Sequence, residues 1–508
     1  MAEQKIIDVE PRHLKMVNSI FARNLPFKKV WAFGSRVKWT ARPASDLDCV
    51  VFGATDGEIS KAKEAFDESE VPFEVQLLNW ENIPDDFKEN IKKEYFVVRE
   101  ESDWGEFKLS DVAKEIRDVY QPASNGDHLY IGLEHIEQQS LRLNGVGHSS
   151  EIQSTKHFFR ENDILFGSLR PYFRKVVKPK FAGVCSTDIT VIRSIPEIVD
   201  QGFLYYLIAS EPFIAHASNI ANGSRMPRAS WKVVSSFQWL IPSLPTQQKI
   251  ASILSAYDDL IENNNRRIKI LEEIARDLYR EWFVNFKFPN NQNTKFVDSE
   301  LGKIPEGWEV CLFSDELLIQ NGFAFKSSEY SNKGTKLTRT KDFASSKYLV
   351  NDDIIFIPKE LSSKYSNYFL KDFDFLLIMV GASIGKYGVV LKKDIPTLQN
   401  QNMWAIRPRN RENLKQWIIL MMPNLIESIA GFATGAAREF FRKEHFNNLK
   451  IVVPSDEIII SFSEIVNNIF EEISALLSKN QNLRKTRDLL LPRLISGELS
   501  VENLEVKI

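Results

Sequence analysis

Two stretches of the chain place mainly apolar residues in an unbroken alternation of four and three positions. The first runs from Ile250 to Trp282 and the second from Phe462 to Leu494, with ten seam positions in each. This period is typical of helices that pair side by side, because residues three and four apart share one helix face. A single amphipathic helix on a globular core is the alternative, but the length of the seams favours a coiled coil. At 1.5 Å per residue each helix should span on the order of 50 Å.

Each seam also contains one asparagine, Asn264 in the first helix and Asn480 in the second. A polar residue on such a seam costs stability and can fix the register of the paired helices. Polarity that is merely tolerated near solvent is an equally good interpretation.

The chain repeats itself once, with a long period. Residues 104–111 (WGEFKLSD) resemble residues 308–315 (WEVCLFSD), and each opens a stretch rich in glycine, aromatic and β-branched residues. Each stretch closes on a strand-like segment, 240–242 or 452–454, that leads through a short turn into a long helix. The repeat therefore predicts two β-rich domains, each followed by a helix. An antiparallel helix pair would place these domains at opposite ends of a rod, a geometry that suits a divided target.

Composition restricts the classes of protein that remain. The three cysteines, Cys49, Cys185 and Cys311, form no CxxC pair, which argues against a disulfide framework or a zinc site. The N-terminus lacks a signal pattern and the longest apolar run, 375–385, is too short for a membrane helix, so we expect a soluble, cytoplasmic protein. The net charge is −3, and acidic residues exceed basic ones only in the first 100 positions. Any binding to DNA must therefore use local basic patches or a basic partner.

Two short sequence motifs connect this architecture to a known family. Residues 240–250 (LIPSLPTQQKI) lead into the first helix, and residues 489–499 (LLLPRLISGEL) end the second. Together with the alternation of β-rich unit and helix, residues 103–505 resemble the specificity subunit of type I restriction-modification systems. The resemblance implies two target-recognition domains, each reading half of a bipartite site in double-stranded DNA. It also implies that the paired helices set the spacing and dock two methyltransferase subunits, in a complex with restriction subunits.

The motifs of catalysis are missing from residues 103–508. The sequence there has no NPPY-like methyltransferase motif, no GxxxxGK[ST] loop and no HExxH pair. We therefore expect this body to need no cofactor, with partners supplying the S-adenosylmethionine and ATP chemistry. The rival hypothesis is a scaffold whose β-rich domains bind protein rather than DNA.

Two loop segments in each repeat concentrate residues suited to DNA. They are 167–175 and 223–228 in the first repeat, and 381–387 and 435–443 in the second. Arginine can pair bidentately with guanine, and lysine, serine and tyrosine can hold phosphates. Ordinary solvated charges on loops are the alternative. The DNA-binding candidates are Ser168, Arg170, Tyr172, Arg174, Lys175, Arg225, Arg228, Lys386, Tyr387, Arg438, Arg442 and Lys443.

A separate motif lies near the N-terminus. Gly34 and Ser35 follow an apolar strand and can open a turn whose amides and hydroxyl face a phosphate. Asp46 and Asp48, two apart on a strand, share one face and could hold a divalent metal. Glu74, in a later strand-like segment, is the candidate third carboxylate. These five residues are the catalytic candidates, and the three acids are the metal ligands, for chemistry that aligns a nucleoside triphosphate.

This pattern resembles the minimal nucleotidyltransferases of the polymerase-β superfamily over residues 1–98. The resemblance implies Mg²⁺ and a nucleoside triphosphate as cofactor and substrate. The chain departs from the family at Lys38-Trp39, where an Arg-Gly pair is common. Two roles stay open: nucleotidyl transfer to a partner protein, as in toxin-neutralising relatives, or a domain kept for docking or nucleotide sensing.

The predicted fold class is α+β and multidomain. A small α/β nucleotidyltransferase-like domain precedes two β-rich target-recognition domains, which are separated by two long antiparallel coiled-coil helices. The expected ranges are 1–98 for the first domain, 103–244 and 300–455 for the β-rich domains, 245–286 for the first spacer helix, and 456–496 for the second, with a tail to 508.

Overall fold

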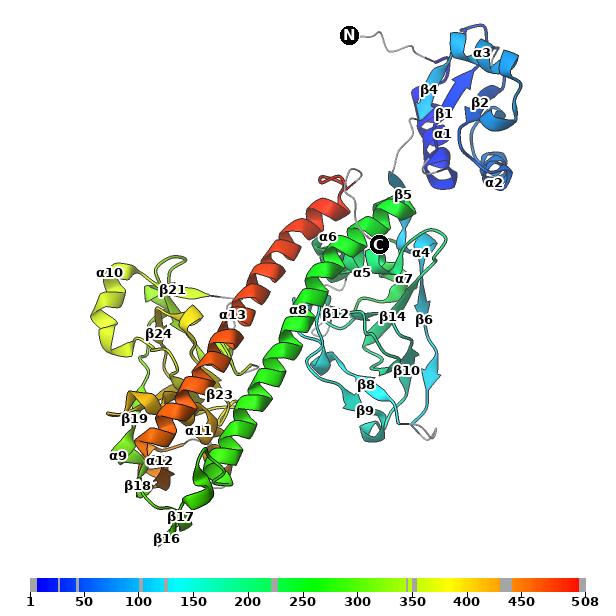
Figure 1. Cartoon of the computed structure of the whole chain (residues 1–508). Coiled ribbons are helices and arrows are strands. Elements are labelled where there is room, and N and C mark those ends of the chain that lie inside the picture. The colour runs from blue at the N-terminus through cyan, green and yellow to red at the C-terminus, as the bar shows by residue number, and fades with distance from the viewer. Residues whose placement is uncertain are drawn as a thin grey trace. The chain divides into compact units, whose positions relative to one another are not determined.

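The computed structural model divides the chain into two compact units. One consists of Met1–Asp258 and Lys485–Ile508, and the other of Asp259–Arg484. Figure 1 shows the order of the elements along the chain. No helix within the described residues is long and apolar enough to cross a membrane. The described residues are 7–25, 28–42, 45–99, 104–122, 127–220, 227–343, 346–349, 354–429 and 441–501.

The N-terminal domain is a four-stranded sheet in the order β3-β2-β1-β4, with β2 and β3 parallel and the other pairs antiparallel. Helices α1 and α2 pack on one face, where Phe21 and Phe66 join the buried residues of β1, β2 and β3. A capping box of Thr55 and Glu58 starts α2. The elements are α1 (Pro11–Asn24), β1 (Val30–Phe33), β2 (Leu47–Val51), α2 (Asp56–Asp67), β3 (Val75–Asn79), η1 (Trp80–Asn82), α3 (Asp85–Lys93) and β4 (Phe96–Arg99).

The first repeat contains two main sheets, ordered β7-β10-β13-β8-β9 and β12-β11-β14-β6. Its first and last strands, β5 and β15, pair antiparallel and close the domain. The elements are β5 (Trp104–Lys108), α4 (Leu109–Val112), β6 (Ala113–Ile116), β7 (Val119–Tyr120), β8 (Leu129–Ile131), β9 (Gly147–His148), β10 (Lys156–Phe159), β11 (Ile164–Gly167), β12 (Val176–Val177), β13 (Gly183–Cys185), β14 (Ile189–Ser194), α5 (Gln201–Ile208), α6 (Glu211–Ile220), α7 (Trp231–Val234) and β15 (Gln238–Pro242).

The second repeat shares most of these strand pairings, although its second sheet, β21-β20-β24, has three strands within the described residues where the first repeat has five. Its sheet β23-β22-β25-β19 matches β12-β11-β14-β6 strand for strand, β24 pairs parallel with β20 as β13 does with β8, and β18 pairs with β26. The elements are β16 (Phe296–Ser299), β17 (Gly302–Pro305), β18 (Glu309–Leu312), α9 (Phe313–Glu316), β19 (Leu317–Asn321), β20 (Thr335–Thr338), β21 (Ile355–Ile357), α10 (Lys359–Ser362), β22 (Phe375–Ile378), β23 (Tyr387–Val389), β24 (Thr397–Gln399), β25 (Met403–Pro408), α11 (Lys415–Ile429), α12 (Lys443–Asn447) and β26 (Lys450–Val453).

A buried ion pair occurs at the same place in both repeats. In the first, Arg193 on β14 donates twice to Asp163 at 2.7 Å; in the second, Arg407 on β25 donates twice to Asp374 at 2.5 Å. Both carboxylates are buried at the start of the neighbouring strand. Bidentate pairing compensates the cost of burying these charges and fixes the two central strands against each other.

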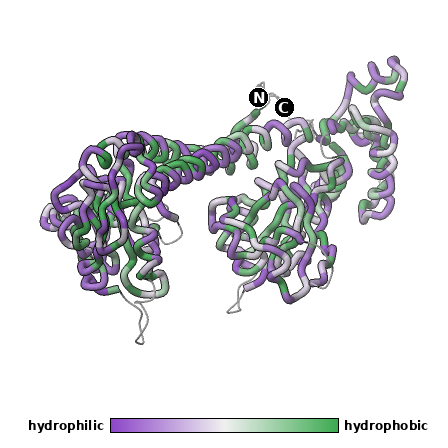
Figure 2. Tube along the Cα trace, turned by 60° about the horizontal axis from the view of Figure 1, so that its bottom comes forward, coloured by the Kyte–Doolittle hydropathy of each residue, from purple (hydrophilic) through white to green (hydrophobic). Residues whose placement is uncertain are grey.

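The long helices are α8 (Leu244–Tyr279), extended by a π-helical turn (Arg280–Val284), and α13 (Asp456–Ile495). In the second unit, Ile268 on α8 shares a core with Val466 and Leu476 on α13. In the first unit, Leu254 near the start of α8 shares a core with Leu494 near the end of α13. The helices are therefore antiparallel within each unit, which confirms the predicted fold class. Figure 2 shows apolar residues recurring among polar ones along both helices.

The two seam asparagines meet. Asn264 donates its side-chain amide to Asn480 at 2.8 Å, and Asn480 donates to Asn265 at 3.0 Å. Asn264 and Asn480 are both buried, so a shift of either helix would leave amides unpaired inside the seam. Register fixation is thus the interpretation that the geometry favours.

A second polar contact interrupts the seam in the first unit. Arg487 occupies a seam position, is 1% exposed, and donates to Asp258 on α8 and to Asp488. Asp258 also accepts the hydroxyl of Tyr206 on α5, at 2.6 Å. One buried network therefore joins both long helices to the first β-rich domain.

Replacing Arg487 by alanine should lower the free energy of unfolding of the first unit by about 3 kcal/mol, because Asp258 would lose its counter-charge while it remains partly buried. Arg493→Ala, which removes an exposed ion pair with Glu498 just beyond the end of α13, should cost less than about 1 kcal/mol. Scanning calorimetry of the full chain measures both. Equal effects of the two variants would contradict a structural role for the network.

Candidate nucleic-acid interface and N-terminal acidic site

The structure brings the two loop segments of the first repeat together. Arg170 donates its backbone N–H to Pro227 at 2.8 Å, and Ala229 donates to the carbonyl of Ser168 at 2.9 Å. Leu169 and Arg228 form an antiparallel bridge between these contacts. Arg170 and Arg228, far apart in the sequence, thus come from two adjacent backbone segments.

The second repeat has a corresponding contact. Phe441 donates its backbone N–H to the carbonyl of Met379 at 2.9 Å, as Ala229 does to Ser168 in the first repeat. This contact joins the segment before α12 to the turn after β22. Each repeat therefore presents a composite surface, formed by the turn after one central strand and the segment that precedes the last strand.

Three of the predicted DNA contacts use their cationic groups inside the protein. Arg174 donates to the carbonyl of Ala209 at 2.7 Å, Lys443 donates to that of Ile319 at 2.8 Å, and Lys175 donates to a carbonyl of the 3₁₀ turn after β8. Burial lowers the pKa of all three groups. Their hydrogen bonds hold the loops in shape.

Of the other candidates in the first repeat, Tyr172 and Arg228 are exposed, Arg170 is half-buried and Ser168 is buried. Arg170 has a left-handed backbone, with φ of +52°, and Tyr172 is 46% exposed. Arg228 pairs with the carboxylate of Asp188 while its own side chain stays more than half exposed. Ser168 is buried and donates its hydroxyl to the carbonyl of Asp188 at 2.8 Å. A strained backbone, as at Arg170, is common at binding sites.

In the second repeat, Lys386 and Arg442 are exposed, and Tyr387 stacks on Phe375 with 5.1 Å between ring centroids. Arg225 and Arg438 lie outside the residues that the structure describes. Sequence reasoning missed Asp188, which carries no motif of its own and becomes visible only through its pairing with Arg228.

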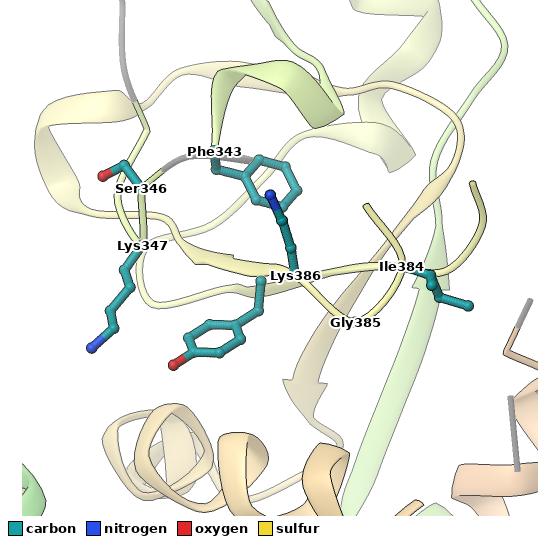
Figure 3. A pocket seen from close by; sticks show the side chains of 7 residues that line it. Phe343, Ser346, Lys347, Ile384, Gly385 and Lys386 are labelled. Carbon is teal, nitrogen blue, oxygen red and sulfur yellow. The ribbon is translucent and has the colours of Figure 1, made fainter. Parts of the chain in front are cut away.

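Lys386 and Tyr387 border an open pocket of about 500 Å³. Figure 3 shows Ile384, Gly385 and Lys386 following one another along one side of this pocket. Lys347, another lining residue, lies 3.6 Å from Glu272 on α8. Two ammonium groups beside an aromatic surface suit a phosphate with its attached sugar or base. The lining residues are Phe343, Ser346, Lys347, Ile384, Gly385, Lys386 and Tyr387.

In the N-terminal domain, the turn after β1 is fixed by two residues. Gly34 has φ of +81°, and a Cβ atom there would lie 2.5 Å from an oxygen of Asp48. Arg36 is buried, donates to the carbonyls of Ser45 and Asp8, and lies over the ring of Phe73. Arg36 thus anchors the loop that leads to Asp46, a role that the sequence pattern did not reveal.

The acidic group contains two carboxylates and one amide. Asp46 precedes β2 and Asp48 lies on it; burial, and then the charge of Asp46, raise the pKa of Asp48. Gln76 on β3 donates to Asp46 at 3.0 Å. Glu74 is exposed one residue before β3, and the part of the chain that the structure describes has no group of three His, Cys, Asp or Glu placed to hold a metal. Asp46, Asp48 and Glu74 are therefore not assembled as one metal site, and these residues do not fit two-metal chemistry.

Gly34→Ala should destabilise the N-terminal domain by about 1–3 kcal/mol, because alanine is strained at this φ and its methyl group would meet Asp48. Gly57→Ala, in the first turn of α2 with nothing closer than 4.0 Å, should be neutral or stabilising. The thermal unfolding of the two full-length variants provides the measurement. A neutral Gly34→Ala would show that the turn does not require glycine.

Comparisons with known proteins agree with this architecture. Residues 101–273 and 305–485 match the type I restriction modification DNA specificity domain, and residues 15–103 match the polymerase beta nucleotidyltransferase model. The chain is similar to two specificity subunits of Methanocaldococcus jannaschii. It is 30% identical to that of type I restriction enzyme MjaIX over 309 residues (59% of this chain, 70% of the relative) and 24% identical to that of MjaVIII over 424 residues (82% and 98%).

The front of the chain has a different relative. Over 97 residues, 18% of this chain and 85% of the relative, it is 39% identical to the probable protein adenylyltransferase MntA of Haemophilus influenzae. That similarity supports the nucleotidyltransferase-like fold predicted for the N-terminal domain. Because the specificity-domain model matches well over half of the chain, this protein belongs to the family of type I restriction-modification specificity subunits.

Proposed function

We propose that this chain reads DNA for a type I restriction-modification complex, with each repeat contacting one half of a bipartite site. The observation that carries the proposal is the composite surface that occurs in both repeats: Ala229 bonds to Ser168 in one and Phe441 bonds to Met379 in the other. Two copies of one surface on one chain suit a target with two halves.

Charge supports a division of labour between this chain and its partners. The net charge is −3, whereas affinity for DNA comes largely from neutralised phosphates. Among the described residues of the composite surfaces the exposed cations are few, chiefly Arg228 in the first repeat and Lys386 and Arg442 in the second, with Arg170 half-buried. We therefore propose that base reading lies in this chain, and that two methyltransferase subunits and the restriction subunits add most of the contacts to phosphates.

The two repeats offer different chemistry for base reading. Arg228 is oriented by Asp188, and an arginine held in this way can donate to O6 and N7 of guanine. In the second repeat, Arg442 is the N-cap residue of α12, and Lys386 and Lys347 line the open pocket. The lysines suit phosphate oxygens and the arginine suits a base edge.

Arg228→Ala should weaken discrimination at one base pair of the first half-site, by about 1–3 kcal/mol, and leave the second half-site unaffected. Arg442→Ala should do the reverse. The measurement is competitive binding by the complex with methyltransferase subunits, using DNA substituted in either half. Arg117→Ala, which removes an exposed arginine at the end of β6, is the control and should change neither half. Equal loss at both halves would indicate phosphate binding alone.

The length of the paired helices should set the gap between the half-sites. Inserting seven residues immediately after Asn265 in α8 and seven immediately before Asn480 in α13 preserves the seam and lengthens the pair by about 10 Å. The gap in the methylated motif should then grow by about three base pairs. Insertion in one helix only should abolish modification. An unchanged gap in the double insertion would disprove the spacing role.

A further inference from the structure

Gln76 lies beside Asp46 in the N-terminal domain, and its position bears on the chemistry of that domain rather than on DNA reading. Strands β2 and β3 are parallel, and Asp48 stands directly opposite Gln76 in their register. Side chains at opposed positions of neighbouring strands point to the same face of a sheet. The adjacent pair, Leu47 and Val75, is buried in the helix-covered core, so Asp48 and Gln76 share the opposite face.

Gln76 is bound to the acidic group through a donated hydrogen bond. Its amide Nε2 donates to Oδ2 of Asp46 at 3.0 Å. A carboxylate at this place could coordinate a metal ion together with Asp46 and Asp48. The amide instead carries no charge and donates a hydrogen bond to one oxygen of Asp46. The site therefore combines two negative charges with a neutral donor.

Glu74 does not replace the missing charge. Its side chain is exposed, and it lies one residue before β3, outside the register in which Gln76 stands opposite Asp48. The rest of the site is built as a binding turn: Gly34 leaves room for the Asp48 carboxylate, and the buried Arg36 holds the preceding loop. The turn after β1 and the two aspartates are thus in place, whereas Gln76 brings an amide to the position where a third carboxylate would stand.

We infer that the N-terminal domain does not transfer nucleotides, because Gln76 occupies the place of the third metal-binding carboxylate. The domain keeps the nucleotidyltransferase fold with a two-carboxylate site. Glutamate is nearly isosteric with glutamine, so Gln76→Glu supplies the missing carboxylate without a change in packing.

The first test measures Mn²⁺ binding to the full chain by electron paramagnetic resonance. Gln76→Glu should bind Mn²⁺ at least tenfold more tightly than the wild type, and the gain should vanish in Gln76→Glu/Asp48→Asn. Glu74→Gln should bind Mn²⁺ as the wild type does. Weaker binding in Glu74→Gln would make Glu74 the third ligand, and no gain in Gln76→Glu would place the site elsewhere; either result overturns the inference.

The second test follows pyrophosphate release from ATP with Mg²⁺, using the full chain within its restriction-modification complex. The wild type should release no more than Asp48→Asn. Release by the wild type that disappears in Asp48→Asn would overturn the inference. Circular dichroism melts of all variants verify folding, and because DNA reading uses other residues, these results leave the proposed function untouched.

Discussion

The apolar seam between α8 and α13 continues directly into the core of each β-rich domain. In the second unit, Phe283 at the end of α8 lies with its ring centroid 4.7 Å from that of Phe462 on α13 and 5.8 Å from that of Trp308 beside β18. In the first unit, Leu254 and Leu494 belong to the same cluster as the buried residues of α5. Each β-rich domain also has smaller apolar clusters of its own, but its largest core includes residues of the helix pair, so the helices and the domain pack as one body within each unit.

Polar groups on this seam determine the register of the two helices rather than the strength of their pairing. A purely apolar seam of period 3.5 permits sliding by one heptad, since every heptad presents a similar surface. Asn264 and Asn480 satisfy each other at one offset only, and Arg487 meets Asp258 only at that same offset. The spacing between two reading surfaces is useful only if it is constant, and buried polar pairs make sliding costly.

The parts of the fold that the sequence predicts are those with a local signal. The helices follow from a period that is read within the chain, and the β-rich repeat follows from similarity between its ends. The ion pairs Asp163–Arg193 and Asp374–Arg407 join residues from separate segments of the chain, so no local sequence pattern predicts them. The loops were found by composition, but the inward orientation of Arg174 depends on a carbonyl of a distant helix end.

The N-terminal site shows a related limit. A search for acids selects Glu74, since it is the acidic residue of its segment, whereas the register of β2 and β3 places Gln76 opposite Asp48. Residues two apart on a strand share one face, so only the register shows which of Glu74 and Gln76 stands opposite Asp48. Pairing in a sheet therefore had to be known before the ligand position could be assigned.

The two repeats share a backbone plan and differ where bases would be read. The carbonyl of Asp188 accepts the N–H of Ser168 at 2.9 Å, and the carbonyl of Asn402 accepts that of Met379 at 3.3 Å, so the same turn is built twice. The side chains at these matched positions are a carboxylate in one repeat and an amide in the other. A carboxylate accepts hydrogen bonds only, while an amide both donates and accepts. Equal scaffolds with unequal donors and acceptors would let the two repeats select different sequences, whereas identical surfaces would select the same sequence twice.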